Sequence, residues 1–222
     1  MKRIIINSCK VVSGVCFALI LSGCLSIKNS PTPRFYVLST EDENQASKKV
    51  NIISEVFIGV GPVKIPEYLE RPQMVTQSKE KILKFAQFDR WGESLDLGLT
   101  RLIRENLTIM LPGAKLALYP WNITIPIKYQ VVVEIVQLDS ELDKDLLFVA
   151  QWLIIDTQNF KTMIMKRSEF RQPIIPQNYS GLAKTLSTVC GLLSSEIAEA
   201  LATIETHPET KKDARVVIPG YN

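Results

Sequence analysis

The chain has 222 residues, of which 46% are hydrophobic, with 26 Lys and Arg against 23 Asp and Glu. Three of the basic residues and none of the acids fall within the first 23 positions, so the remainder is close to neutral. This balance excludes the strongly basic surface of a nucleic-acid-binding protein. The only histidine, His207, lies near the C-terminus, which leaves a Ser-His-Asp triad or a histidine-based metal site without a centre.

The N-terminus has the pattern of a bacterial lipoprotein signal peptide. Three basic residues (Lys2, Arg3 and Lys10) precede an apolar run over 11–21 that is too short to span a bilayer. The tetrad Leu-Ser-Gly-Cys at 21–24 then has the form of a lipobox. We expect cleavage after residue 23 and lipidation of Cys24 by a thioether-linked diacylglycerol and an N-acyl chain. The alternative is an uncleaved N-terminal membrane helix.

The rest of the chain is predicted to form one domain. We expect a signal peptide over 1–23, the lipidated cysteine and a polar linker over 24–33, a folded domain over 34–206, and a flexible tail over 207–222. Fully extended, the linker spans at most about 30 Å, which keeps the domain close to its membrane. After cleavage Cys190 is the only cysteine besides Cys24, and its apolar helical surroundings favour a buried side chain over a reactive thiol.

The first half of the domain mixes short strands with one helix. Strands are predicted over 35–38 and 56–63, separated by a polar loop, and a hairpin is predicted from 74–77 and 81–85. Gly59 and Gly61 within the second strand indicate a bulge or a close backbone approach. Apolar residues at helical spacing predict a helix over 93–110, which ends before Pro112-Gly113.

The second half contains a meander and a long helix. A short strand over 115–118 precedes three strands over 129–138, 146–156 and 162–170, and the short turns between these three favour antiparallel pairing. A helix follows over 180–204. The predicted fold class is α/β of the α+β kind, with a single, largely antiparallel sheet covered by two long amphipathic helices. The apolar strand residues are explained by a core, with no surplus apolar stripe that demands a ligand.

Catalytic signals are weak. The chain has no G-x-S-x-G, no phosphate-binding glycine loop and no Cys-x-x-Cys, and its acid pairs fall in predicted turns. We therefore predict no enzymatic activity, no metal site and no cofactor.

Three clusters, over 65–72, 88–93 and 119–121, combine aromatic and charged residues in a way that is typical of protein interfaces. Trp91 is expected to offer an anchoring surface, and Arg90 to pair with Glu93 or Glu70. The alternative for each cluster is local structure, such as loop packing, helix capping or an aromatic that closes a sheet edge. The candidate residues for a partner or oligomer interface are Tyr68, Glu70, Arg71, Arg90, Trp91 and Trp121.

These clusters, in this order, carry a family resemblance. Arg34-Phe35-Tyr36-Val37-Leu38, Ile58-Gly59-Val60-Gly61-Pro62-Val63 and the stretch from Tyr68 to Val75 come first. Arg90-Trp91-Gly92-Glu93, Tyr119-Pro120-Trp121, Gln151-Trp152-Leu153 and the end of the last helix follow. The chain resembles the ABC-type transport auxiliary lipoproteins of the PqiC-like kind.

The resemblance implies a fold like the N-terminal domain of TolB and a non-enzymatic role in an MCE system, which carries phospholipids between the inner and outer membranes. The implied partners are an MCE-domain protein, an inner-membrane permease and further copies of the chain in a ring. Leu25, in place of an Asp after the lipidated cysteine, favours anchoring in the outer membrane. Two alternatives stay open: an envelope-assembly module without a transport role, and a lipoprotein hydrolase that uses an acid pair such as Asp89 and Glu93.

Overall fold

The computed structural model describes residues 31–40 and 55–206. The chain divides into two compact units, Met1–Thr32 and Pro33–Asn222, and all the described secondary structure belongs to the second. The signal peptide, Cys24, most of the linker and the C-terminal tail lie outside the described residues. Neither of the two long described helices is apolar enough to cross a membrane.

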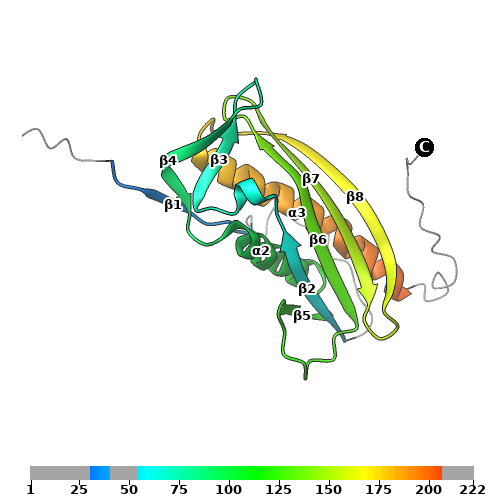
Figure 1. Ribbon diagram of the computed structural model, residues 1–222. Coiled ribbons are helices and arrows are strands. Elements are labelled where there is room, and N and C mark those ends of the chain that lie inside the picture. Colours follow the sequence, from blue (N-terminus) through cyan, green and yellow to red (C-terminus); the bar gives the residue numbers. More distant parts are fainter. Residues whose placement is uncertain (1–30, 41–54, 207–222) are drawn as a thin grey trace, which may run out of the picture. The chain divides into compact units, whose positions relative to one another are not determined.

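A five-stranded sheet forms the body of the domain, with the strand order β5-β2-β6-β7-β8 (Figure 1). The predicted antiparallel meander is confirmed in β6 (Tyr129–Ser140), β7 (Asp145–Asp156) and β8 (Lys161–Pro173). β2 (Val56–Lys64) runs parallel to both β5 (Ala114–Leu118) and β6. Alternation of side chains along each strand directs one set of apolar residues into the core.

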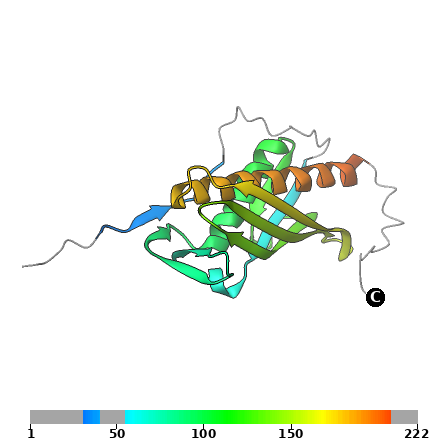
Figure 2. The same cartoon turned by 90° about the horizontal axis from the view of Figure 1, so that it is seen from above.

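Two long helices cover one face of this sheet. α2 (Leu95–Met110) packs on β2 and β5, whereas α3 (Tyr179–Thr206) packs on β7, β8 and α2 (Figures 1 and 2). Between the helices, the Asn106 amide donates to Ser194 Oγ at 3.4 Å, and Ser194 Oγ donates to the carbonyl of Cys190 at 2.7 Å. The predicted α+β class and its two covering helices are confirmed.

The prediction of a single sheet is wrong, because a second sheet of three strands stands beside the first. Its strand order is β1-β4-β3, from β1 (Arg34–Tyr36), β4 (Leu83–Trp91) and β3 (Gln73–Gln77). After β2 the chain turns through the 3-10 helix η2 (Glu67–Leu69), which offsets the β3–β4 hairpin from the end of β2. β4 then pairs with the N-terminal strand instead, in parallel.

A polar chain fixes α3 onto the sheet. Trp152 Nε1 donates to Ser168 Oγ at 2.9 Å, and Ser168 Oγ donates to the Glu196 carboxylate at 2.6 Å. Lys166 Nζ reaches the same carboxylate at 2.8 Å. These contacts give the buried Trp152 and Ser168 the partners that polar groups need when they leave water.

Two glycines of α3 predict opposite effects of one substitution. A Cβ at Gly181 would lie 1.8 Å from the Pro176 carbonyl oxygen, whereas a Cβ at Gly191 would have no neighbour within 4 Å. We expect Gly181→Ala to lower the free energy of unfolding by about 1–3 kcal/mol through overpacking. Gly191→Ala should raise it by about 0.5–1 kcal/mol, because alanine favours the helix. Urea denaturation checks both, and equal effects of the two variants would contradict the close approach at Gly181.

Candidate functional site

The strand that follows the predicted lipid linker is held by a buried acid. The Asp89 carboxylate, with 6% of its side chain exposed, receives Arg34 Nε at 2.9 Å and Arg34 Nη2 at 3.0 Å. It also accepts the Tyr36 hydroxyl at 2.8 Å. The acid raises the pKa of the Arg34 guanidinium, and burial followed by the same hydrogen bond raises the pKa of Tyr36. β1 is therefore bound to β4 by side-chain contacts as well as by backbone pairing.

Arg101 of α2 holds the next residues of this segment. Its guanidinium donates to the Leu38 carbonyl at 2.8 Å and to Glu93 at 2.6 Å, and it reaches Glu105 at 3.1 Å. Hydrogen bonding to Glu93 is the main cause of the raised pKa of Arg101. Farther along, the Ser39 amide donates to Ser187 of α3 at 3.3 Å. We call Arg34, Tyr36, Asp89, Glu93 and Arg101 the tether collar.

Most residues of the cluster over 88–93 make contacts within the domain and do not form an exposed surface. Trp91 is only 7% exposed and belongs to the core, so the expectation that it is an exposed anchor is wrong. Its backbone amide donates to the Pro72 carbonyl at 2.7 Å, which joins β4 to the loop before β3. Glu93 pairs with Arg101 instead of Arg90, and no ion pair joins Arg90 to Glu93 or Glu70 among the described residues. Asp89 and Glu93 each form an ion pair with an arginine, Asp89 with Arg34 and Glu93 with Arg101.

The cluster over 65–72 divides between packing and exposure. The Tyr68 ring packs against the core, its hydroxyl lies 3.5 Å from the Leu138 carbonyl, and burial raises its pKa. Glu70 and Arg71 are exposed, and the Arg71 guanidinium lies 4.3 Å from the centre of the Phe85 ring. Of the three interface candidates in this cluster, Glu70 and Arg71 are therefore the ones available to a partner.

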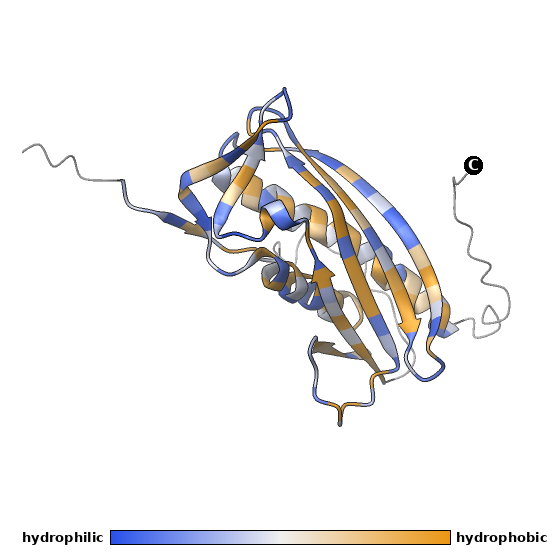
Figure 3. Ribbon diagram, viewed as in Figure 1, coloured by the Kyte–Doolittle hydropathy of each residue, from blue (hydrophilic) through white to orange (hydrophobic). Residues whose placement is uncertain are grey.

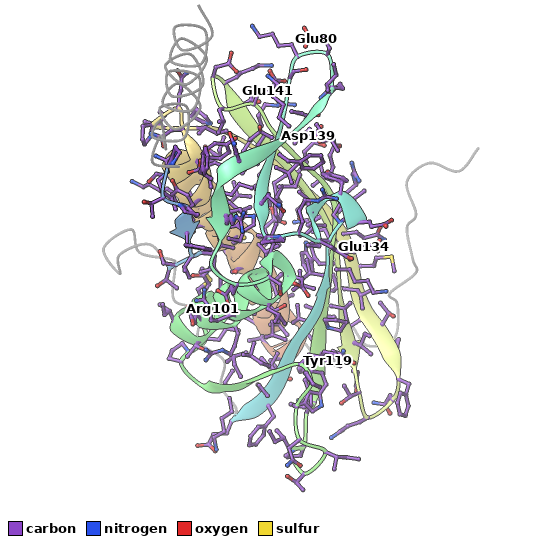
Figure 4. All side chains as sticks on the ribbon, turned by 60° about the vertical axis from the view of Figure 1, so that its left-hand side comes forward. Glu80, Arg101, Tyr119, Glu134, Asp139 and Glu141 are labelled. Atoms are coloured by element: carbon purple, nitrogen blue, oxygen red, sulfur yellow. The ribbon has the colours of Figure 1, made fainter. Side chains whose placement is uncertain are left out.

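The third cluster, over 119–121, packs against β2 at Gly59 and Gly61, where a larger residue would not fit. A Cβ on Gly59 would lie 2.5–2.9 Å from ring atoms of Trp121, and one on Gly61 would lie 2.9 Å from the Tyr119 Cβ. The Tyr119 and Trp121 rings meet edge to face with 5.6 Å between their centres. The loop after β5 therefore lies directly on the backbone of β2. Figure 4 shows Tyr119 in this position, and the Trp121 side chain is half-buried there.

The described residues contain no group of three or more His, Cys, Asp or Glu side chains arranged to hold a metal ion. Cys190 is fully buried, and burial raises the pKa of its thiol to about 12, so the thiolate required for nucleophilic chemistry is disfavoured.

Sequence reasoning missed one apolar surface. Along β7 the even-numbered side chains enter the core, whereas Leu147, Leu153 and Ile155 on the opposite side are only half-buried. On the neighbouring strands, Val136 and Met165 are 45% and 50% exposed. The near-continuous apolar run of β7 is typical of a strand that is buried on both faces, and it was the available signal.

Comparison with known proteins decides the family. A family model described as the ABC-type transport auxiliary lipoprotein component matches residues 36–198, most of the described domain. The chain belongs to this family. The match runs from Tyr36 in β1 to Ala198 in the last third of α3, and the resemblance carried by the motifs is confirmed.

Solved structures agree with this fold. A crystal structure of an uncharacterised protein has a TM-score of 0.61 at 19% identity, covering 77% of this chain and 99% of that one. A Xanthomonas campestris protein has a TM-score of 0.61 at 8% identity, covering 81% and 100%. At these identities the likeness concerns the fold alone. No curated protein matches the chain.

Removal of the collar acid is expected to free β1. In Asp89→Asn the Arg34 guanidinium and the Tyr36 hydroxyl lose a charged acceptor, so we expect β1 to detach more often, while the exposure of Arg34 keeps the effect on global stability small. Faster hydrogen exchange at the amides of β1, with little change in α3, would report local release. The matched control is Asp143→Asn in the exposed turn between β6 and β7. Equal exchange in the two variants would contradict the collar.

The contact of Gly59 with Trp121 predicts non-additive stability. Gly59→Ala should cost about 1–3 kcal/mol, because the new methyl group meets the Trp121 ring. In a Trp121→Ala background the same change should cost less by at least about 1 kcal/mol, because nothing remains to be displaced. A double-mutant cycle by urea denaturation measures the difference, and additive costs would mean that the ring does not rest on β2.

Proposed function

We propose that the protein is an outer-membrane-anchored lipoprotein component of an MCE/ABC-type system for intermembrane phospholipid transport. It acts there as a docking or ring-forming partner and not as a catalyst. Membership of the transport auxiliary lipoprotein family supports the transport role. The lipobox ending at Cys24, followed by Leu25, supports lipid anchoring and the outer membrane.

The observation that carries the proposal is the tether collar. If the linker only joined a lipid to an independent domain, the residues directly after the linker would need no side-chain contacts with that domain. Here the first strand after the linker is bound by Asp89, and the following backbone is bound by Arg101 and Ser187. The chain therefore joins the domain at a fixed point, and the proposed lipid anchor would hold the domain near the membrane through that point.

Exposed side chains near η2 supply a docking surface. Glu70 and Arg71 face solvent beside the β3–β4 hairpin, where Ile82 and Phe85 are 62% and 49% exposed. Charged residues around exposed apolar ones are typical of the rim and centre of a protein interface. We assign the contact with the MCE-domain protein to this surface.

Co-purification tests the proposal. The tagged full-length lipoprotein, extracted from membranes in mild detergent, should capture an MCE-domain protein and its permease. Arg71→Glu reverses a charge on the docking surface and should reduce capture at least about tenfold. Lys184→Glu, a reversal at an exposed position of α3 outside this surface, is the matched control and should retain it. A folded, membrane-bound protein that captures neither partner under any condition would overturn the transport role.

A further inference from the structure

We propose that the side of β1 that faces away from Asp89 rests on the bilayer that holds the lipid anchor. Phe35 and Val37 enter the boundary between headgroups and acyl chains there, and the Arg90 guanidinium of β4 binds lipid phosphates. We call these three residues the membrane face. The inference rests on the proposed function in taking Cys24 as the anchor, and it gives the folded domain a membrane contact of its own.

The tether collar turns two apolar side chains outward. Side chains alternate across a strand, and Arg34 and Tyr36 both point to Asp89. Phe35 and Val37 therefore lie on the opposite side, where they are 64% and 59% exposed. A strand beside water normally places apolar residues inward and polar ones outward, and this segment does the reverse. The reversal indicates that its outward side meets an apolar medium.

Arg90 adds an unpaired cation beside Phe35. The parallel register of β1 and β4 pairs these two residues, so their side chains leave the same side of the sheet. The Arg90 side chain is half-buried, forms no ion pair with another described residue, and has a buried Nε without a hydrogen-bond partner among those residues. A buried donor without an acceptor is costly. A phosphate group supplies the acceptor, because a guanidinium binds phosphate through two parallel N–H···O bonds.

The chemistry of this face fits the headgroup layer of a bilayer. Figure 3 shows hydrophobic and hydrophilic residues side by side in the second sheet, whereas β7 is hydrophobic over much of its length. At a membrane surface, apolar side chains enter the boundary between headgroups and acyl chains, and arginine keeps its charge among the phosphates. Phe35 and Val37 supply the first kind of contact and Arg90 supplies the second. One medium therefore satisfies all three residues.

The tether places this face near a membrane. β1 begins directly after the predicted linker, which spans at most about 30 Å from Cys24. The Ser39 amide donates to Ser187 in the first third of α3, and Figures 1 and 2 show β1 beside the start of that helix. The membrane face therefore lies at the end of the domain that the anchor holds.

The other end of α3 provides an internal reference. Phe160, in the turn between β7 and β8, is 89% exposed. In the same turn the Thr157 amide donates to the Lys128 carbonyl at 3.0 Å, and Lys128 Nζ pairs with Glu205 near the end of α3 at 2.6 Å. A helix of this length extends about 42 Å. Phe160 is therefore an equally tethered apolar residue that lies away from the membrane face.

Depth-dependent quenching tests the contact. The full-length lipidated chain is reconstituted in vesicles of phosphatidylcholine and phosphatidylglycerol, with a fluorophore on Val37→Cys or on Phe160→Cys. Cys190 is fully buried and does not compete for the label. Lipids with a nitroxide near the headgroup should quench the label at position 37 at least about threefold more than the label at position 160. Equal quenching, or none at position 37, in a membrane-bound chain would overturn the inference.

The role of Arg90 is tested with the label at position 37. Arg90→Gln should lose at least about half of the quenching, whereas Arg90→Lys should keep most of it because the charge remains. Arg167→Gln, at an exposed position of β8, is the matched control and should keep it. Equal losses in Arg90→Gln and Arg90→Lys, or no loss in either, would overturn the phosphate contact.

Two further outcomes separate this inference from the proposed function. If the label at position 37 is shielded only when a captured MCE-domain protein is present, the face belongs to a protein partner and the inference is overturned. Quenching at position 37 without capture of such a protein counts against the proposed function alone.

Discussion

Burial of the core-facing side of β7 is the constraint on which the rest of the domain depends. One side presents Phe148 and Trp152 to the core, and both are almost completely buried beneath α3. The Trp152 indole needs a hydrogen-bond acceptor once it leaves water, and Ser168 supplies it while donating in turn to Glu196. Apolar packing and hydrogen bonding of the buried indole thus both hold α3 on β7. The opposite side is almost equally apolar, but no described helix covers it.

The two ends of the sheet are adapted to different tasks. At the start of β6, Lys128 ties the end of α3 to the sheet through Glu205, and the aromatic loop after β5 rests on the glycines of β2. At the other end the chain arrives from its predicted lipid linker and enters the tether collar. The collar uses charge where the rest of the domain uses apolar packing. A β-strand of three residues buries too little surface to hold itself, and the Arg34–Asp89 pair offsets that deficit.

Much of this fold follows from sequence, for reasons visible at particular residues. The spacing of apolar residues predicts α2 and α3, and the short turns predict the meander. The second sheet was not predictable, because β1 and β4 lie 55 residues apart at the Arg34–Asp89 contact and only the tertiary fold brings them together. Trp91 shows why the exposure of a candidate site residue is hard to predict from sequence. An aromatic residue beside charges is typical of an interface, but here β4 directs the Trp91 side chain into the core. The Gly59–Gly61 spacing predicted a bulge or a close approach, and both occur: the β2–β6 register shifts between Val60 and Val63, and the Trp121 ring packs on Gly59.

The tether collar limits how the proposed lipid anchor can act on the domain. Asp89 binds the first strand after the predicted linker, and Arg101 binds the backbone of Leu38, so the chain joins the domain at one fixed point. A linker that spans at most about 30 Å from that point would keep the domain beside the membrane that holds Cys24. Under the proposed function, anchoring therefore confines the docking surface around Glu70 and Arg71 to a thin layer and raises its effective concentration toward a partner in the same layer, without any new contact.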